Sequence, residues 1–196
     1  MKKTKIKLGV FTLPIILLIF FTLNNYLLVI ITPIIIHELG HIVAAWILNI
    51  KISEFSVGIL GARLKTGPDQ LSYGNEIILA LFGPLANFLC VFVGYVIYKK
   101  YNFHDTYLFL MTSLLLGAIN LLPIKTFDGG RIFESFLSIF LPLGWAVRIT
   151  YIISLICIIT LWLISVYFLL IYSSSLGLFV FSLSLFFEIF VSENLS

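Results

Sequence analysis

The sequence predicts an all-α polytopic membrane protein with about six transmembrane helices. Hydrophobic residues make up 61% of its 196 residues and charged residues only 11%, whereas soluble domains carry about 25% charged residues. The mean hydropathy is +1.14. Spans of about 20 residues with short loops use up almost the whole length. We therefore expect one transmembrane domain over residues 1–196, multi-pass in the cell membrane, with the lipid bilayer and no nucleic acid as partner.

Apolar runs delimit six expected spans: 8–23, 27–49, 76–98, 106–141, 145–171 and 175–191. The first follows a basic start and lacks a cleavage site made of small residues, so we expect an uncleaved anchor. The fourth is apolar to Leu122, breaks at Pro123 and at Asp128-Gly129-Gly130, and resumes at Arg131. Only Ser173 to Ser175 and Gly177 mark the start of the last span.

Positive charges indicate the orientation. If the N-terminus is cytoplasmic, ten of the twelve lysines and arginines fall on the inner side and only Lys99 and Lys100 fall outside. The inner ten are Lys2, Lys3, Lys5, Lys7, Lys51, Arg63, Lys65, Lys125, Arg131 and Arg148. Cytoplasmic loops carry such an excess of positive residues. The sequence therefore predicts that the N- and C-termini are both cytoplasmic.

The segment His37-Glu38-Leu39-Gly40-His41 lies inside the second apolar run. Two histidines four residues apart on a helix are only about 40° apart around its axis, so both imidazoles can reach one metal ion. Glu38 lies beside them, where it can take a proton from a metal-bound water. Because ionisable residues are costly inside a membrane helix, they indicate a functional site.

A catalytic zinc usually has three protein ligands, so a third is expected elsewhere in the chain. Asp128 is the only acid in a break within a membrane segment, between Pro123 and the two glycines. Irregular backbone at that depth is tolerated only where it is buried in protein or lines a cavity. The remaining acids lie in loops, at span ends, near the chain end or one turn beyond the break: Glu54, Asp69, Glu76, Asp105, Glu134, Glu188 and Glu193.

Two motifs together resemble the site-2 protease family of intramembrane zinc metalloproteases. The family pattern is His-Glu-x-x-His on one membrane helix and Asn-x-x-Pro-x-x-x-x-Asp-Gly on a later one. This chain has His37 to His41, and Asn120-Leu121-Leu122-Pro123 followed by Asp128-Gly129. Gly83-Pro84-Leu85-Ala86-Asn87 is similar to the core helix of the family. The resemblance covers about residues 27–141, and it implies a catalytic core made of the second to fourth spans.

The resemblance implies a role for each matching residue. His37, His41 and Asp128 would bind Zn²⁺, and Glu38 would be the catalytic general base. Asn120 and Asn87 are candidates for hydrogen bonds to the substrate backbone or to the developing oxyanion. Asparagines in membrane helices also bond neighbouring helices without any catalytic role.

Residues 51–75 are the longest piece between spans. They are expected to form two short strands, Ile52 to Leu60 and Ala62 to Tyr73, with a turn signal at Thr66 to Asp69. An ordinary cytoplasmic hairpin is one interpretation. The family resemblance implies a membrane-associated β-hairpin beside the active site, whose strand edge would receive an unwound substrate segment.

The implied function is an intramembrane endopeptidase that cleaves a membrane-associated or transmembrane protein, such as a sigma-factor precursor or another regulatory protein. A membrane inhibitor or regulator is a further expected partner, and the oligomeric state is left open. The alternative is a non-proteolytic membrane metal-binding or metal-transport protein, but no internal repeat is visible and Glu38 would have no task. The short form resembles the sporulation-type branch, although the CBS domain common in that branch is not expected here.

Overall fold

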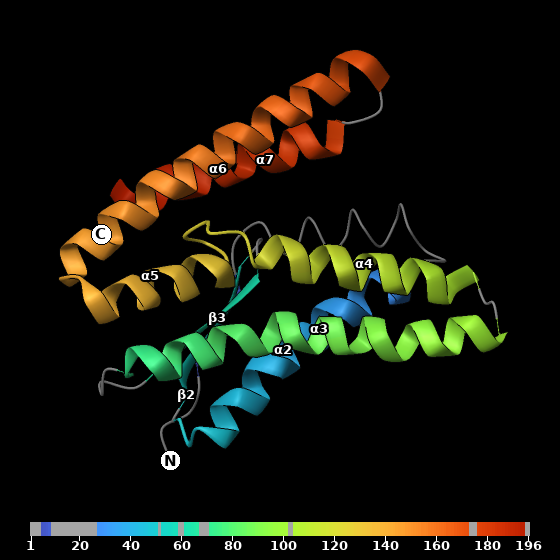
Figure 1. Cartoon of the computed structure of the whole chain (residues 1–196), viewed down its shortest axis with the longest axis horizontal. Helices are drawn as coiled ribbons and strands as arrows, with labels where there is room; N and C mark the ends of the chain where they lie inside the picture. The colour runs from blue at the N-terminus through green and yellow to red at the C-terminus, as the bar shows by residue number, and fades with distance from the viewer. Residues whose placement is uncertain are drawn as a thin grey trace. The chain divides into compact units, whose positions relative to one another are not determined.

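The computed structural model describes residues 5–8, 27–50, 52–58, 61–66, 71–101, 104–172 and 176–194 (Figure 1). The chain divides into two compact units, Met1–Leu121 and Leu122–Ser196. The first unit holds strand β1 (Lys5–Leu8), helix α2 (Leu27–Ile47), strands β2 (Ile52–Gly58) and β3 (Gly61–Thr66), and helices α3 (Tyr73–Tyr101) and α4 (His104–Asn120). The second holds helices α5 (Asp128–Phe140), α6 (Leu143–Tyr172) and α7 (Leu176–Asn194).

Helices α2, α3 and α4 pack against one another in the first unit. The contact between α2 and α3 is close because small residues line it. A Cβ atom added at Gly40 of α2 would collide with the backbone carbonyl of Phe82 on α3. Ala44 and Ala45 are almost fully buried with Leu79. Small residues at a helix interface let two backbones approach, which is how helices associate in a membrane.

Helix α2 ends in a Schellman motif. Asn49 has a positive φ of 52°. The Ile50 N–H donates to Ala45 O at 2.9 Å, and the Asn49 N–H donates to Trp46 O at 3.1 Å. Asparagine tolerates the left-handed conformation, so it can stop a helix in this way. Ile50 packs against the buried cluster of Ala44, Ala45 and Leu79, which anchors the chain after the turn.

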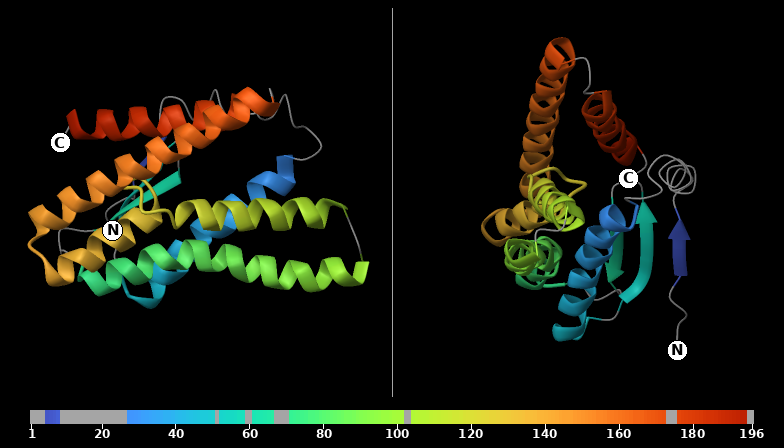
Figure 2. Two further views of the ribbon diagram at one scale, coloured as in Figure 1. Left: turned by 45° about the horizontal axis from the view of Figure 1, so that its top comes forward. Right: turned by 90° about the vertical axis from the view of Figure 1, so that its right-hand side faces the viewer.

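The three strands of the first unit form one sheet in the order β1-β2-β3 (Figure 2). β1 pairs with β2 in parallel, and β2 pairs with β3 antiparallel. Gly58 pairs with Gly61, so the chain reverses between these two residues. Thr66, the first residue of the expected turn signal, still belongs to β3. Residues 67–69, the rest of that signal, lie outside the described residues.

In the second unit, α6 packs against both α5 and α7. Ser165 on α6 and Ser182 on α7 lie with their hydroxyl oxygens 3.3 Å apart, and both side chains are buried. Phe127, just before α5, stacks on Phe181 of α7 with ring centroids 6.5 Å apart. The serine contact joins α6 to α7, and the phenylalanine contact joins the start of α5 to α7.

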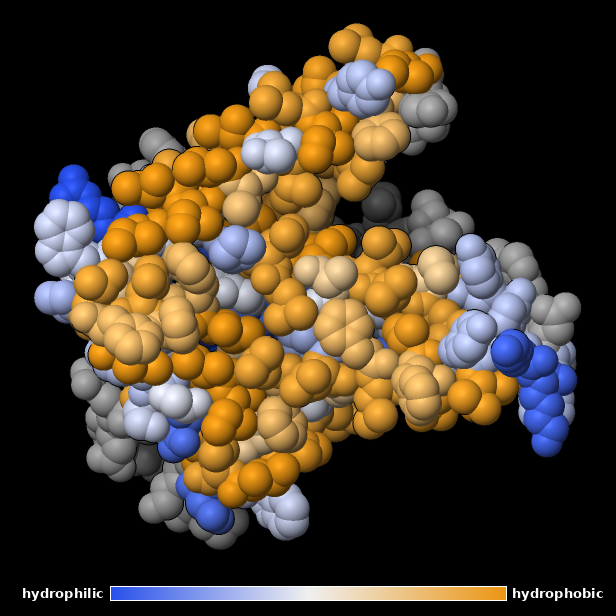
Figure 3. All heavy atoms as spheres, viewed as in Figure 1, coloured by the Kyte–Doolittle hydropathy of each residue, from blue (hydrophilic) through white to orange (hydrophobic). Residues whose placement is uncertain are grey.

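Most helix surfaces are apolar, as Figure 3 shows on one face. Trp46 is 80% exposed, Leu170 77% and Phe140 71%. Such exposure suits contact with lipid chains and not with water. Three helical stretches are long and apolar enough to cross a membrane, Val29–Ile47, Tyr73–Tyr101 and Leu143–Ile171. The chain is therefore a membrane protein.

The expected spans agree only in part with these stretches. The apolar parts of α4 and α7, Thr106–Asn120 and Leu176–Ile189, are shorter than a full span, and the expected first span lies almost entirely outside the described residues. The count of six spans is thus not supported. The break in the fourth span is confirmed, because α4 ends at Asn120 and α5 begins at Asp128.

Candidate metal centre

The two histidines of α2 present the same ring nitrogen to each other. His37 Nε2 and His41 Nε2 lie 3.2 Å apart, and the ring planes are 83° apart. Both side chains are only 4% exposed. Two nitrogens bound to one tetrahedral zinc at 2.0–2.1 Å would lie about 3.3 Å apart. The observed separation of the two nitrogens therefore fits two corners of a zinc site.

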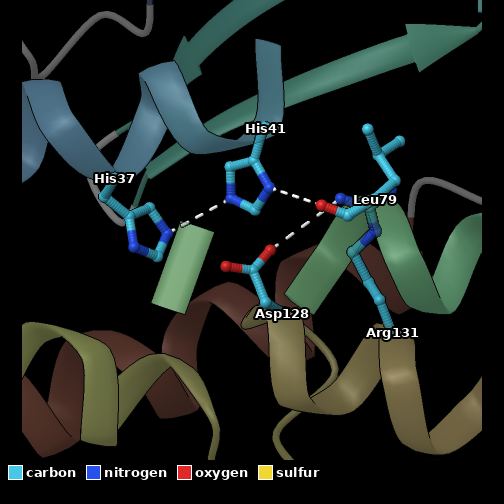
Figure 4. Close-up of polar contacts among 5 residues, drawn as sticks. All are labelled: His37, His41, Leu79, Asp128 and Arg131. Carbon is cyan, nitrogen blue, oxygen red and sulfur yellow. Dashed lines mark hydrogen bonds and ion pairs between the residues drawn. The ribbon is translucent and has the colours of Figure 1, made fainter. Parts of the chain in front are cut away.

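Helix α3 sets the orientation of both rings. His41 Nδ1 lies 2.8 Å from the carbonyl oxygen of Leu79 (Figure 4). Because a carbonyl oxygen can only accept, Nδ1 carries the proton and Nε2 keeps its lone pair. On His37, Nδ1 lies 3.1 Å from Asn87 Nδ2. A contact such as that of His41 with Leu79, at the outer nitrogen of the ring, fixes the tautomer of a histidine that binds a metal.

Gly83 lies directly against the two imidazoles. A Cβ atom at this position would lie 2.6 Å from His41 Cε1 and 2.8 Å from His37 Nε2. Any side chain at position 83 would therefore fill the space that the ring nitrogens face. Leu79, Gly83 and Asn87 are spaced by four residues, so they share one face of α3. That face is the wall of the histidine site.

Asp128 belongs to the second unit, where it is the first residue of α5. Its side chain is 11% exposed, and its Oδ1 lies 3.9 Å from Arg131 Nη1 (Figure 4). The N-terminus of a helix stabilises a carboxylate. Position 128 can therefore keep an ionised acid in an apolar environment.

The segment before Asp128 is irregular and held in place by α6. Ser154 Oγ accepts the Lys125 N–H at 2.9 Å, and it lies 3.3 Å from Pro123 O. Gly130 allows this segment to fold back on α5, because a Cβ there would lie 2.7 Å from Lys125 Cα and collide with the carbonyl of Ile124. Ile124 is fully buried and Phe127 nearly so. The backbone leading to the carboxylate is therefore fixed by packing.

Glu38 and Asn120 are half-buried. Glu38 is adjacent to His37 on α2. Asn120 Nδ2 donates to Leu116 O, one turn earlier on its own helix, at 3.0 Å. Asn87 is fully buried on α3.

Comparison with known proteins agrees with this geometry. Residues 102–164 match the model of peptidase family M50. A zinc metalloprotease of Methanocaldococcus jannaschii is 29% identical over 113 residues, which is 54% of this chain and 32% of that protein. The chain thus spans about a third of the length of this curated relative. The structure of a site-2 protease from the same organism superposes with a TM-score of 0.69, covering 94% of this chain and 88% of that one at 24% identity.

The chain has the site-2 protease fold. The resemblance suggested by its two motifs is therefore confirmed in the fold, and the family match adds the sequence around Asp128. Neither comparison assigns the chain to the sporulation-type branch.

The residue types present are ones that zinc accepts. His37, His41 and Asp128 each offer one ligand atom, two imidazole nitrogens and a carboxylate oxygen. Zinc accepts this donor set, and a catalytic zinc keeps a fourth position open. The small Gly83 leaves room next to the histidine nitrogens. The types of donor atom and the space beside Gly83 are two independent observations, and both are compatible with a bound zinc ion.

Sequence reasoning missed three contributors to the site. Gly83 was noted only within a motif, although its spacing of four from Leu79 and Asn87 could have indicated a shared face. The carbonyl of Leu79 carries no side-chain signal and could not have been found. Ser154, 26 residues after Asp128 and in another helix, became visible only through its contacts with Pro123 and Lys125.

Proposed function

We propose that this chain is an intramembrane zinc endopeptidase that hydrolyses a peptide bond in or near a transmembrane segment of another protein. The observation that carries the proposal is the pair of buried Nε2 atoms 3.2 Å apart on α2. Asp128 would complete the ligand set with His37 and His41. The family match and the site-2 protease fold support this assignment.

Each side chain has a defined task in the hydrolysis. When bound, zinc lowers the pKa of its water to about 7 and polarises the scissile carbonyl. Glu38 takes a proton from the attacking water as the new C–O bond forms. It then gives that proton to the leaving nitrogen as the C–N bond breaks. Asn120 is the candidate donor to the substrate backbone or to the developing oxyanion, since it lies at the end of α4.

The substrate must be unwound before it is cut, because a helix hides its peptide bonds in its own hydrogen bonds. In the sheet order β1-β2-β3, strand β3 (Gly61–Thr66) lies at one edge. We infer that this edge, beside the membrane, receives the extended substrate segment by strand addition. A regulatory protein such as a sigma-factor precursor is our candidate substrate class, supported by the likeness of Asn120 to Arg131 to the sporulation-type branch.

Replacing the base tests the proposal. Glu38→Gln keeps the shape of the side chain and leaves the ligands in place, but it cannot accept the proton of the water. We expect the purified variant to hold as much zinc as the wild type. We also expect it to leave intact a co-expressed single-span membrane protein, encoded by a neighbouring gene, that the wild type cuts. Cleavage by Glu38→Gln at the wild-type rate would refute the general-base role.

A metal carrier is the competing function. In a carrier Glu38→Gln would leave zinc flux into proteoliposomes unchanged, and no substrate would be cut by either protein. Flux without cleavage in the wild type would therefore replace our proposal with the alternative.

A further inference from the structure

The amide of Asn87 is the least explained polar group in the histidine site. The side chain is fully buried on α3. Its Nδ2 lies 3.1 Å from His37 Nδ1, whereas its Oδ1 has no hydrogen-bond partner among the residues that the structure describes. Buried amide oxygens are normally bonded. The unused acceptor lies on the side chain that touches a proposed zinc ligand.

The contact through Nδ2 is incompatible with metal binding by His37. An amide nitrogen donates, so His37 Nδ1 would have to accept and the ring proton would lie on Nε2. A protonated Nε2 has no lone pair for a metal. Yet Nε2 is the atom that faces His41 Nε2. For His37 to be a ligand, its proton must lie on Nδ1 and must find an acceptor there.

Asn87 Oδ1 can be that acceptor. A half-turn of the amide about its Cβ–Cγ bond exchanges Oδ1 and Nδ2 with almost no change in shape. His37 Nδ1–H then donates to Oδ1, and Nε2 is free to bind. This arrangement would match that of His41, whose Nδ1–H donates to the carbonyl oxygen of Leu79. Both rings would then be held by oxygens on one face of α3.

We propose that Asn87 is a positioning residue, which holds His37 as a zinc ligand by accepting its Nδ1–H through Oδ1. The inference rests on the proposed zinc site and replaces contact with substrate as the task of Asn87. An acceptor on the outer nitrogen of a ligand histidine typically changes metal affinity by about 10–100-fold. The effect of Asn87 should thus appear in zinc affinity, before any catalytic step.

Two substitutions separate the oxygen from the nitrogen of the amide. Asn87→Asp keeps an acceptor of the same shape and has no donor. Asn87→Leu keeps a similar volume and has neither. Ser113→Ala is the matched control, because it removes another fully buried polar group, on α4, that makes no hydrogen bond to a histidine.

The measurement is the zinc affinity of each full-length protein in detergent, by competition with a chromophoric chelator. We expect Asn87→Leu to bind zinc about 10–100-fold more weakly, while Asn87→Asp stays within about threefold of the wild type or binds more tightly. Ser113→Ala should match the wild type. Folding is checked by helical circular dichroism and a single size-exclusion peak. If Asn87→Leu does not fold, Asn87→Asp decides the outcome.

Two results would overturn the inference. One is a folded Asn87→Asp that has lost zinc as strongly as His37→Ala, which would show that the donor nitrogen is the needed atom. The other is wild-type affinity in Asn87→Leu. A raised KM for cleavage by Asn87→Leu at saturating zinc, with unchanged zinc affinity, would return Asn87 to substrate binding.

Failure of the proposed function looks different in the same assay. If the wild type binds no zinc, or if His37→Ala and His41→Ala bind it as tightly as the wild type, the zinc site itself is wrong. If the wild type binds zinc through the histidines and only the Asn87 variants behave unexpectedly, the inference alone fails.

Discussion

At the scale of single residues, the proposed metal centre depends on the small Gly83 as well as on the residues that would bind zinc. Gly83 has no side chain, and a Cβ atom added there would lie against His41 Cε1 and His37 Nε2. Its partners on the same face of α3, Leu79 and Asn87, hold the outer nitrogens of the two rings. One face of α3 therefore orients the two histidines of α2 and leaves space beside them.

Gly83→Ala should weaken zinc binding roughly tenfold or more, because its Cβ would lie 2.6–2.8 Å from ring atoms and would push the imidazoles from their positions. Gly74→Ala on the same helix is the control, since nothing lies within 4 Å of an added Cβ there. Zinc content per protein, measured by mass spectrometry after dialysis, compares the two. Equal zinc in both variants would show that Gly83 does not shape the site.

At the scale of elements, the break between α4 and α5 is what brings a carboxylate to a helix N-terminus. This break could be predicted from sequence, because Pro123 and the two glycines at 129 and 130 interrupt an otherwise apolar run. Its anchoring could not be predicted. Ser154 holds the segment through backbone atoms of residues 123 and 125, and backbone partners leave no pattern in the sequence.

Gly130→Ala tests this element. Its Cβ would meet the backbone of Ile124 and Lys125, so the segment before Asp128 must shift. Overpacking of this kind costs typically 1–3 kcal/mol. We expect a lower thermal midpoint in detergent and weaker zinc retention than in Gly144→Ala, whose added Cβ meets nothing within 4 Å. A Gly130→Ala protein as stable as Gly144→Ala would contradict the tight fold of the segment.

At the scale of the whole molecule, composition predicted the membrane class correctly. The expected count of six spans is not supported, since three helices of the described residues are long and apolar enough to cross a membrane. An apolar run shows that a segment avoids water, but it does not show where a helix ends. The run 106–141 divides at its predicted break into α4 and α5, and neither helix meets the length of a full span. The approach of His37 to His41 was more predictable than the spans, because two residues four apart need only one regular helix to lie side by side.

The orientation of the chain is a prediction at this scale. With ten of twelve basic residues assigned to the inner side, a reporter enzyme fused after Ser196 should be active in the cytoplasm. The matched fusion, inserted after Lys100 in the expected outer loop, should report the opposite side. A periplasmic or external signal from the Ser196 fusion would reverse the topology and place the site toward the outer face.

The central claim is that one zinc ion is held by His37, His41 and Asp128, and X-ray absorption at the zinc edge tests it most directly. The zinc-loaded wild type should show only nitrogen and oxygen ligands at about 2.0–2.2 Å, with the scattering of two imidazoles. Asp128→Asn should retain zinc more weakly while keeping both imidazoles. Sulfur ligands at about 2.3 Å, fewer than two imidazoles, or wild-type affinity in Asp128→Asn would contradict the account.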